Sequence, residues 1–117
     1  MKPTDLMIKD WVMVKVLSQI PNTYVLHTWA ANDYSRDLQV KPIPLTTEIL
    51  EKNGWEKTEY WHEYQDGKNT IQCCLPDMRG RINGVEIEYF KCEYVHQYQH
   101  LLRLCGLDEL ADNFKVV

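Results

Sequence analysis

Hydrophobic and polar residues alternate along the first third of the chain with the period of two that β-strands show. Residues 10–16 and 23–30 are rich in β-branched and aromatic side chains, which favour strands. Residues 38–43 alternate as well, but Pro42 lacks the amide hydrogen of a central strand position and indicates an edge strand or a strand end. We therefore predict an antiparallel β meander over residues 9–43.

The pattern changes to that of a helix in residues 44–54, PLTTEILEKNG. Thr46 is a good N-cap residue, and Gly54 can adopt the positive φ angle with which many helices end. A helix of about two turns is not stable alone. We therefore expect it to dock on a core through Ile49 and Leu50.

Two β-hairpins are predicted beyond this helix, because the turn dipeptides Asp66-Gly67 and Asn83-Gly84 each stand between runs that are typical of strands. The flanking runs are residues 55–65, 68–75, 81–82 and 85–92. The second half of the chain is therefore predicted to hold an antiparallel two-hairpin sheet with one face to cover.

Residues 94–105, YVHQYQHLLRLC, have the period of an amphipathic helix. At about 100° per residue, one side of this helix carries a stripe formed by Tyr94, Val95, Tyr98, Leu101, Leu102 and Cys105. A shorter amphipathic piece follows at residues 107–114. We predict that the longer helix covers the two-hairpin sheet, which gives an α+β fold and a single domain over residues 1–117.

Two histidines on this helix, His96 and His100, have the four-residue spacing that zinc hydrolases also use. In such a site a glutamate directly after the first histidine acts as general base, and Gln97 stands there instead. Both histidines and Arg103 fall opposite the apolar stripe, where the arginine would repel a cation. We therefore predict no metal and no other cofactor, and we interpret His96, His100 and Arg103 as a solvated or partner-facing helix surface.

The composition is that of one globular domain with an acidic balance. The 117 residues are 44% hydrophobic and 26% charged, with a net charge of −4 and a pI near 5.5. Broad binding to a phosphate backbone requires an excess of lysine and arginine, so nucleic acid is not expected as a partner. The sequence has neither an apolar run of about 18 residues nor a signal-peptide pattern, so we expect a cytoplasmic chain without a membrane partner.

The strongest candidate for a binding site combines two arginines with a cluster of aromatic side chains. Arg79 and Arg81 flank a glycine in a predicted loop, and arginine grips carboxylate or phosphate with forked hydrogen bonds. Tyr60, Trp61 and Tyr64 belong to the neighbouring hairpin, and their rings suit a nucleobase or a protein hot spot. Solvated arginines and ordinary ring packing are the alternative interpretation. A chain of this size rarely encloses a full pocket, which favours a site shared between copies in a homo-oligomer.

Catalytic interpretations depend on weaker patterns. Glu59 and Glu63 are spaced as an acid–base pair can be, but acidic residues at this spacing ordinarily line the solvated face of a strand. The four cysteines include the adjacent Cys73 and Cys74 and no CxxC pair, so we interpret them as reduced and mostly packed thiols. We assign no catalytic residue.

Three stretches carry a resemblance to other proteins: KDWVMVKV, KPIPLTTEILEKNGW and YVHQYQHLLRLCGL. Over most of its length the chain resembles a group of small uncharacterised proteins of Bacteroides-type gut bacteria and of their phages or mobile elements. That group begins with a Gly-Asp-Trp-Val-like strand, as many SH3-like small barrels do, and Lys9 stands here in place of the glycine. The resemblance implies an SH3-like meander and transfers no catalytic residues. It also implies an accessory protein that binds and neutralises something of the host, including nucleotide signals of antiviral defence.

The predicted function is that of a non-catalytic binding protein of phage or mobile-element origin. We expect it to capture a small anionic, nucleotide-like ligand, in the manner of host-defence signal sequestration. The alternative is a protein–protein adaptor or an inhibitor of a host protein, with the same rings as hot spots. A hydrolase is the least expected class.

Overall fold

The computed structural model describes the whole chain except residues 17–18, 59–60, 67–68, 74–79, 84 and 88–92. Its described elements form an α+β fold of short helices and antiparallel sheets, as predicted. The internal contacts group into two compact units. Unit 1 comprises Met1–Pro44 and Tyr94–Asp112, and unit 2 comprises Leu45–Glu93 and Asn113–Val117. The prediction of one domain over residues 1–117 stays a prediction.

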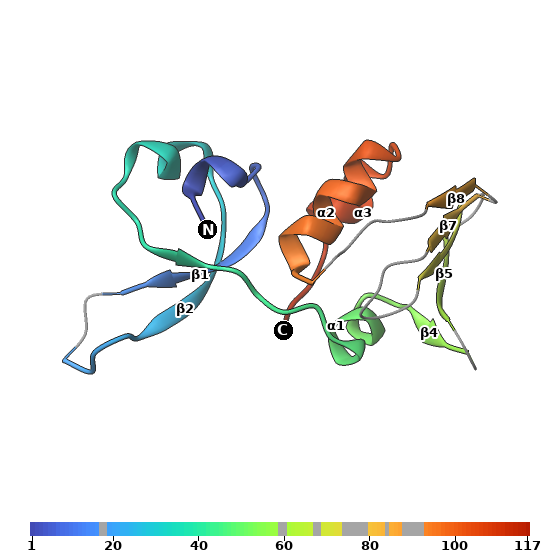
Figure 1. Ribbon diagram of the computed structural model, residues 1–117, viewed down its shortest axis with the longest axis horizontal. Helices are drawn as coiled ribbons and strands as arrows, with labels where there is room; N and C mark the ends of the chain where they lie inside the picture. Colours follow the sequence, from blue (N-terminus) through green and yellow to red (C-terminus); the bar gives the residue numbers. More distant parts are fainter. Residues whose placement is uncertain (17–18, 59–60, 67–68, 74–79, 84, 88–92) are drawn as a thin grey trace. The chain divides into compact units, whose positions relative to one another are not determined.

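The sheet of unit 1 contains the three strands that the sequence predicts, but in a different order. β1 (Trp11–Lys15), β2 (Tyr24–Thr28) and β3 (Val40–Lys41) form an antiparallel sheet in the order β2-β1-β3 (Figure 1). The prediction of a meander is therefore wrong in its pairing, because β3 bonds to β1 instead of β2. The physical reason is that β1 carries the buried residues Val12 and Val14 and is shielded by a strand on each side. An SH3-like arrangement is not confirmed.

Short helices complete unit 1. They are the 3₁₀ helices η1 (Pro3–Asp5) and η2 (Ala31–Ser35) and the α-helices α2 (Val95–Leu104) and α3 (Asp108–Asp112). Both α-helices fall where the sequence predicts them, and α2 packs against β1 and α3. The prediction that α2 covers the two-hairpin sheet stays a prediction. No helix in the described ranges is long and apolar enough to cross a bilayer.

The ends of α2 are fixed by local hydrogen bonds. At its start, Gln97 Oε1 accepts a hydrogen bond from the backbone nitrogen of Tyr94 at 3.2 Å. At its end, Gly106 has a φ of +79°, and the backbone nitrogen of Leu107 donates to the carbonyl of Leu102 at 2.8 Å. Glycine adopts this positive φ without strain, which allows the chain to turn away directly after α2.

Unit 2 begins with α1 (Thr47–Lys52), which confirms the predicted helix and its ends. Thr46 accepts a hydrogen bond on its side chain from the backbone nitrogen of Ile49 at 3.3 Å, and Gly54 has a φ of +90°. Both Ile49 and Leu50 are buried, as expected for a short helix that depends on docking.

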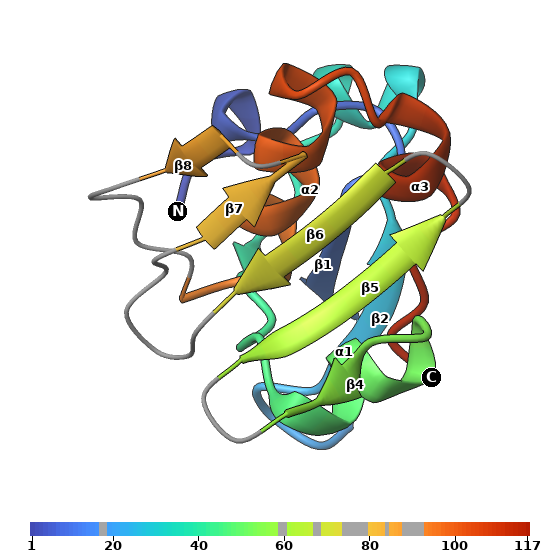
Figure 2. The same cartoon turned by 90° about the vertical axis from the view of Figure 1, so that its right-hand side faces the viewer.

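The sheet of unit 2 contains five described strands in sequence order (Figure 2). They are β4 (Glu56–Lys57), β5 (His62–Asp66), β6 (Asn69–Cys73), β7 (Gly80–Ile82) and β8 (Val85–Ile87). Asn83, with a φ of +52°, follows β7 where the second turn was predicted. The prediction of one strand over residues 55–65 is wrong, because β4 ends at Lys57 and β5 begins at His62, and Thr58 and Trp61 bond to each other through backbone and side-chain atoms.

The core of unit 2 contains a group of aromatic rings. Trp55 and Tyr64 stack with ring centroids 4.5 Å apart, and Phe114 meets Trp55 edge-on at 6.1 Å. The side-chain nitrogen of Asn53 donates to the carbonyl of Lys115 at 2.7 Å, and its side-chain oxygen accepts from the Lys115 backbone nitrogen at 2.6 Å. The C-terminal segment is therefore held on the end of α1.

The chain leaves unit 1 after Pro44 and returns to it at Tyr94, and these two residues form an antiparallel bridge. The backbone nitrogen of Val95 donates to the carbonyl of Ile43 at 2.8 Å. Residues 45–93 are thus inserted into unit 1 between two paired points of the chain.

Candidate ligand-binding cleft

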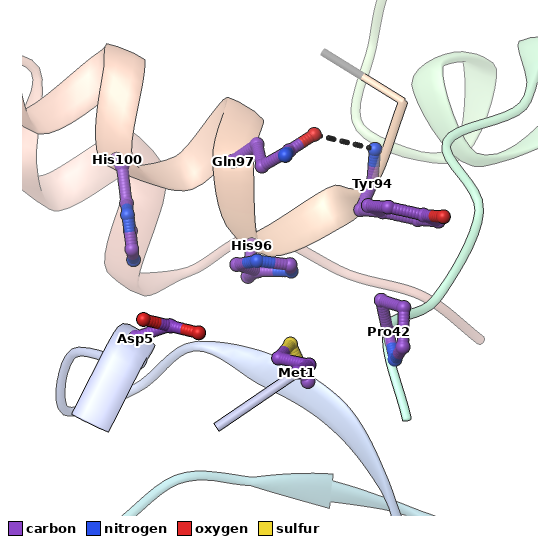
Figure 3. A pocket seen from close by; sticks show the side chains of 7 residues that line it. All are labelled: Met1, Asp5, Pro42, Tyr94, His96, Gln97 and His100. Carbon is purple, nitrogen blue, oxygen red and sulfur yellow. Dashed lines mark hydrogen bonds between the residues drawn. The ribbon is translucent and has the colours of Figure 1, made fainter. Parts of the chain in front are cut away.

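A cleft of about 470 Å³ lies beside the first turns of α2 in unit 1 (Figure 3). Its lining residues come from both chain segments of unit 1 and are Met1, Asp5, Pro42, Tyr94, His96, Gln97 and His100. The volume lies within the range of about 300–1,000 Å³ that small-molecule sites occupy. The size of the cleft therefore suits a small ligand.

Two imidazoles on α2 point toward the segment that carries Asp5 (Figure 3). His96 and His100 are four residues apart, so the helix places them one above the other on the same side. Their ring centroids are 5.7 Å apart, and the planes meet at 79°. The ring of Tyr94 lies nearly parallel to that of His96, at 10° and with centroids 6.0 Å apart.

His96 is 6% exposed, and its Nδ1 atom has no hydrogen-bond partner among the described residues. Burial lowers the pKa of His96 below its ordinary value, although the charge of Asp10 acts in the opposite direction. The ring is therefore neutral near pH 7. A buried nitrogen without a partner costs about 1–3 kcal/mol, so a ligand that bonds to Nδ1 would recover part of that free energy.

His100 is held by a carboxylate that is fully buried. Asp10 Oδ2 lies 2.5 Å from His100 Nε2 and accepts a hydrogen bond from the Met7 backbone nitrogen at 2.7 Å. Asp10 Oδ1 accepts from Arg103 Nη1 at 2.6 Å. Asp10 thus holds the His100 ring and the Arg103 guanidinium together on one side of α2.

The solvated interpretation is wrong for His96 and Arg103, whereas a partner-facing role for His96, His100 and Arg103 stays a prediction. His96 is buried, and the side chain of Arg103 is only 12% exposed because it bridges Asp10 and Asp112. A helical wheel sorts side chains by polarity, and it does not include a buried carboxylate from another segment that turns polar side chains inward.

Gln99 anchors the same helix to the start of β1. Its fully buried side chain accepts from the backbone nitrogen of Trp11 at 2.9 Å and donates to the carbonyls of Lys9 and Ala111, each at 3.0 Å. Lys9 has a φ of +73°, in the region that glycine prefers. The turn before β1 thus takes the backbone conformation that a glycine at this position would favour.

A second histidine–aspartate pair in unit 1 is formed by His27 and Asp33. Asp33 is buried and accepts from the backbone nitrogen of Ala30 at 2.8 Å, with His27 Nε2 at 2.7 Å and Arg36 Nη1 at 3.3 Å. Burial alone would raise the pKa of Asp33, but the hydrogen bonds and the charge of His27 lower it below its ordinary value. Because this carboxylate bonds to the backbone of Ala30, directly before η2, we interpret it as structural.

The predicted arginine and aromatic site is only partly described. Arg79 and Tyr60 lie outside the described residues, and for Arg81 the structure describes only the backbone, in β7. Tyr64 belongs to the ring group of unit 2, and Trp61 is half-buried in the turn before β5. A site formed by these five residues therefore stays a prediction.

The structure describes the predicted glutamate pair and the cysteines only in part. Glu63 lines a small hollow of about 230 Å³ with Gly54, Glu56 and Gln65, while Glu59 lies outside the described residues. Cys73 is buried, and burial raises the pKa of the Cys105 thiol, which keeps that thiol protonated and poorly nucleophilic. Within the described ranges, no group of three or more histidine, cysteine, aspartate or glutamate side chains is arranged to hold a metal ion.

In comparisons with known proteins, no family model, no curated protein and no solved structure matches this chain. The cleft must therefore be interpreted from its own geometry. Sequence reasoning missed Asp5, Asp10 and Gln99 as residues of this region. The turn before β1 is marked in the structure by the positive φ of Lys9.

Proposed function

We propose that this protein is a non-catalytic binding protein that captures a small nucleotide-like ligand in the cleft beside α2. The observation that carries the proposal is the cleft of suitable size, whose wall includes His96, a residue with a buried Nδ1 atom that has no hydrogen-bond partner among the described residues. The parallel rings of Tyr94 and His96 supply a flat aromatic edge, and planar bases are commonly held by such rings. Together these groups favour a planar ligand with polar atoms at its edge.

The anionic character of the ligand is supported by sequence alone, through Arg79 and Arg81. The resemblance to accessory proteins of phages and mobile elements supports a nucleotide signal of host defence as the captured ligand. We propose both as refinements of the same binding function.

The decisive experiment is isothermal titration calorimetry with a panel of nucleobases, nucleosides and mono-, di- and cyclic nucleotides. We expect at least one compound to bind and to raise the unfolding temperature, because a ligand selective for the folded state stabilises it. His96→Phe keeps an aromatic ring and removes Nδ1, and it should abolish that binding. Leu104→Ala, at an exposed residue of the same helix, is the matched control and should bind as the wild type does.

The proposal fails if no compound binds more tightly than about 100 μM, or if His96→Phe binds as tightly as the wild type. A folded His96→Phe variant is confirmed by the same unfolding experiment without ligand, which separates loss of binding from loss of structure.

A protein–protein adaptor is the second candidate function, and one observation favours it. β2 is an edge strand of the described sheet, and its residues Val25 and Leu26 are 46% and 40% exposed. An exposed edge strand can pair with a strand of a partner protein. Capture of a partner by the wild type but not by a Val25→Lys, Leu26→Lys variant would support this function, and equal capture would contradict it.

A further inference from the structure

We infer that the open edge of β2 pairs with the β2 strand of a second copy of this chain, which gives a two-fold symmetric dimer. The strand comprises Tyr24–Thr28 and lies at one edge of the unit 1 sheet. None of its residues lines the cleft beside α2, so the inference goes beyond the proposed ligand binding.

The backbone groups of β2 are divided between its two sides. Directly before the strand, the Thr23 carbonyl accepts a hydrogen bond from the backbone nitrogen of Val16 at 2.9 Å. Directly after the strand, the Trp29 nitrogen donates to the Asp10 carbonyl at 2.8 Å. Residues two apart in a strand direct their backbone groups to the same side, so the odd-numbered residues face β1. The residues that direct their backbone groups to the open edge are Tyr24, Leu26 and Thr28.

The sequence of β2, YVLHT, contains no lysine, arginine, aspartate, glutamate or proline. The other edge strands of the two described sheets do contain or adjoin such residues. β3 ends at Lys41 before Pro42, β4 consists of Glu56 and Lys57, and β8 contains Glu86. Proteins ordinarily protect an exposed sheet edge with charged residues, proline or very short strands. The edge of β2 therefore lacks the features that prevent pairing with another strand.

The strand is complementary to itself, which favours a second copy as the occupant of this edge. When two β2 strands run antiparallel about a two-fold axis at Leu26, each Leu26 lies opposite the other, and Tyr24 lies opposite the partner's Thr28. These are the residues with outward backbone groups, so each opposing pair can exchange two hydrogen bonds. Val25 then lies opposite the partner's His27. Every residue of the strand is paired, and no pair brings like charges together.

Pairing also covers the apolar side chains at this edge. Val25 is 46% exposed and lies opposite the buried Val14, while Leu26 is 40% exposed and lies opposite Met13. A second copy extends both faces of the sheet past these two side chains. The contact comprises only five residues of each chain, which places it at the small end of protein interfaces. We therefore expect a reversible dimer that forms as the concentration rises.

The experiment measures the mass of the full chain by analytical ultracentrifugation from about 5 μM to about 500 μM. We expect the mass to rise from that of one 13.9 kDa chain toward twice that value. Leu26→Lys and Leu26→Glu each place like charges opposite one another at the axis, so each variant alone should dimerise at least about tenfold more weakly than the wild type. An equimolar mixture of the two places opposite charges there and should recover the dimer. Leu104→Lys, at an exposed residue of α2, is the matched control and should dimerise as the wild type does.

A second measurement needs no variant. The outward backbone amide of Leu26 should exchange its hydrogen at least about tenfold more slowly at the highest concentration than at the lowest, because pairing protects it.

A wild type that keeps the mass of one chain up to about 500 μM overturns the inference and leaves the edge to a strand of another protein. A dimer that both charged variants retain, or in which the Leu26 amide gains no protection, uses another surface and also overturns it. A mixture of the two variants that stays monomeric contradicts the pairing of Leu26 with itself. Ligand binding is measured separately, because Leu26→Lys leaves every residue of the cleft lining in place.

Discussion

The buried ion pair between Arg103 and Asp10 should make a large contribution to the stability of unit 1. Replacing Arg103 with methionine keeps an apolar stem and removes the positive charge that faces a fully buried carboxylate. Arg103 Nη1 and Asp10 Oδ1 are 2.6 Å apart. At an effective dielectric constant of about 20, unit charges about 4 Å apart attract by about 4 kcal/mol. Loss of one partner from a buried pair costs about 3–5 kcal/mol, and we expect Arg103→Met to fall at the lower end because His100 and the Met7 amide still contact Asp10.

The assay is urea unfolding followed by tryptophan fluorescence. A shift in the midpoint urea concentration reports a change in stability when the slope of the unfolding free energy against urea is unchanged. Arg103→Lys keeps the charge but loses the forked contact with Asp10 and Asp112, so its cost should be intermediate. Leu104 is 79% exposed, and Leu104→Ala is the control that should stay within about 0.5 kcal/mol of the wild type. A cost for Arg103→Met no larger than that of the control would refute the buried network.

Three further predictions concern the same part of the chain. Gln99→Leu should cost about 1–3 kcal/mol in urea unfolding, because it removes three hydrogen bonds of a fully buried side chain, and an unchanged midpoint would contradict this. Lys9→Gly should be more stable than Lys9→Ala by about 1 kcal/mol. Both variants lose the 3.8 Å contact with Asp112, and only glycine adopts the positive φ without strain. Equal melting temperatures of the two variants would show that the backbone is not strained there. The lowered pKa of His96 means that the unfolded chain binds a proton more readily than the folded one, so stability should fall as the pH falls through the ordinary value of 6.5 toward the lowered one. Unfolding of His96→Phe at several pH values should show a shallower fall than the wild type, and an identical fall would assign the effect to other groups.

Local signals in the sequence were sufficient for most elements of the fold. The N-cap at Thr46, the left-handed exit at Gly54 and the turn at Asn83 each depend on the chemistry of one or two residues, and all three are confirmed. The break between β4 and β5 was missed because the hydroxyl of Thr58 bonds to the backbone of Trp61 inside a run of strand-forming residues. Strand order was missed for another reason: pairing of β3 with β1 is a long-range choice that no local pattern records.

The candidate cleft was harder to predict than the fold. The sequence places His96 and His100 correctly on one side of a helix, but it assigns that side to solvent because both residues are polar. The contact that holds His100 in place is with Asp10, a partner 90 residues away in the chain, and His96 is buried one turn before it. A buried polar network is specified by the match between distant groups, so hydrophobic periodicity within one helix carries no information about it.

The insertion of residues 45–93 between two paired points of unit 1 has a consequence for biosynthesis. At roughly 5–20 residues per second, the ribosome needs roughly 3–10 seconds to add the residues between Pro44 and Tyr94. During that interval β1 has emerged without α2, and its valines are exposed to other nascent chains. During this interval the carboxylate of Asp10 lies in water directly before the apolar strand, where a charged residue opposes aggregation. The carboxylate gains its charged partners only when His100 and Arg103 follow, so the same side chain that opposes aggregation of the unfinished strand later stabilises the finished unit.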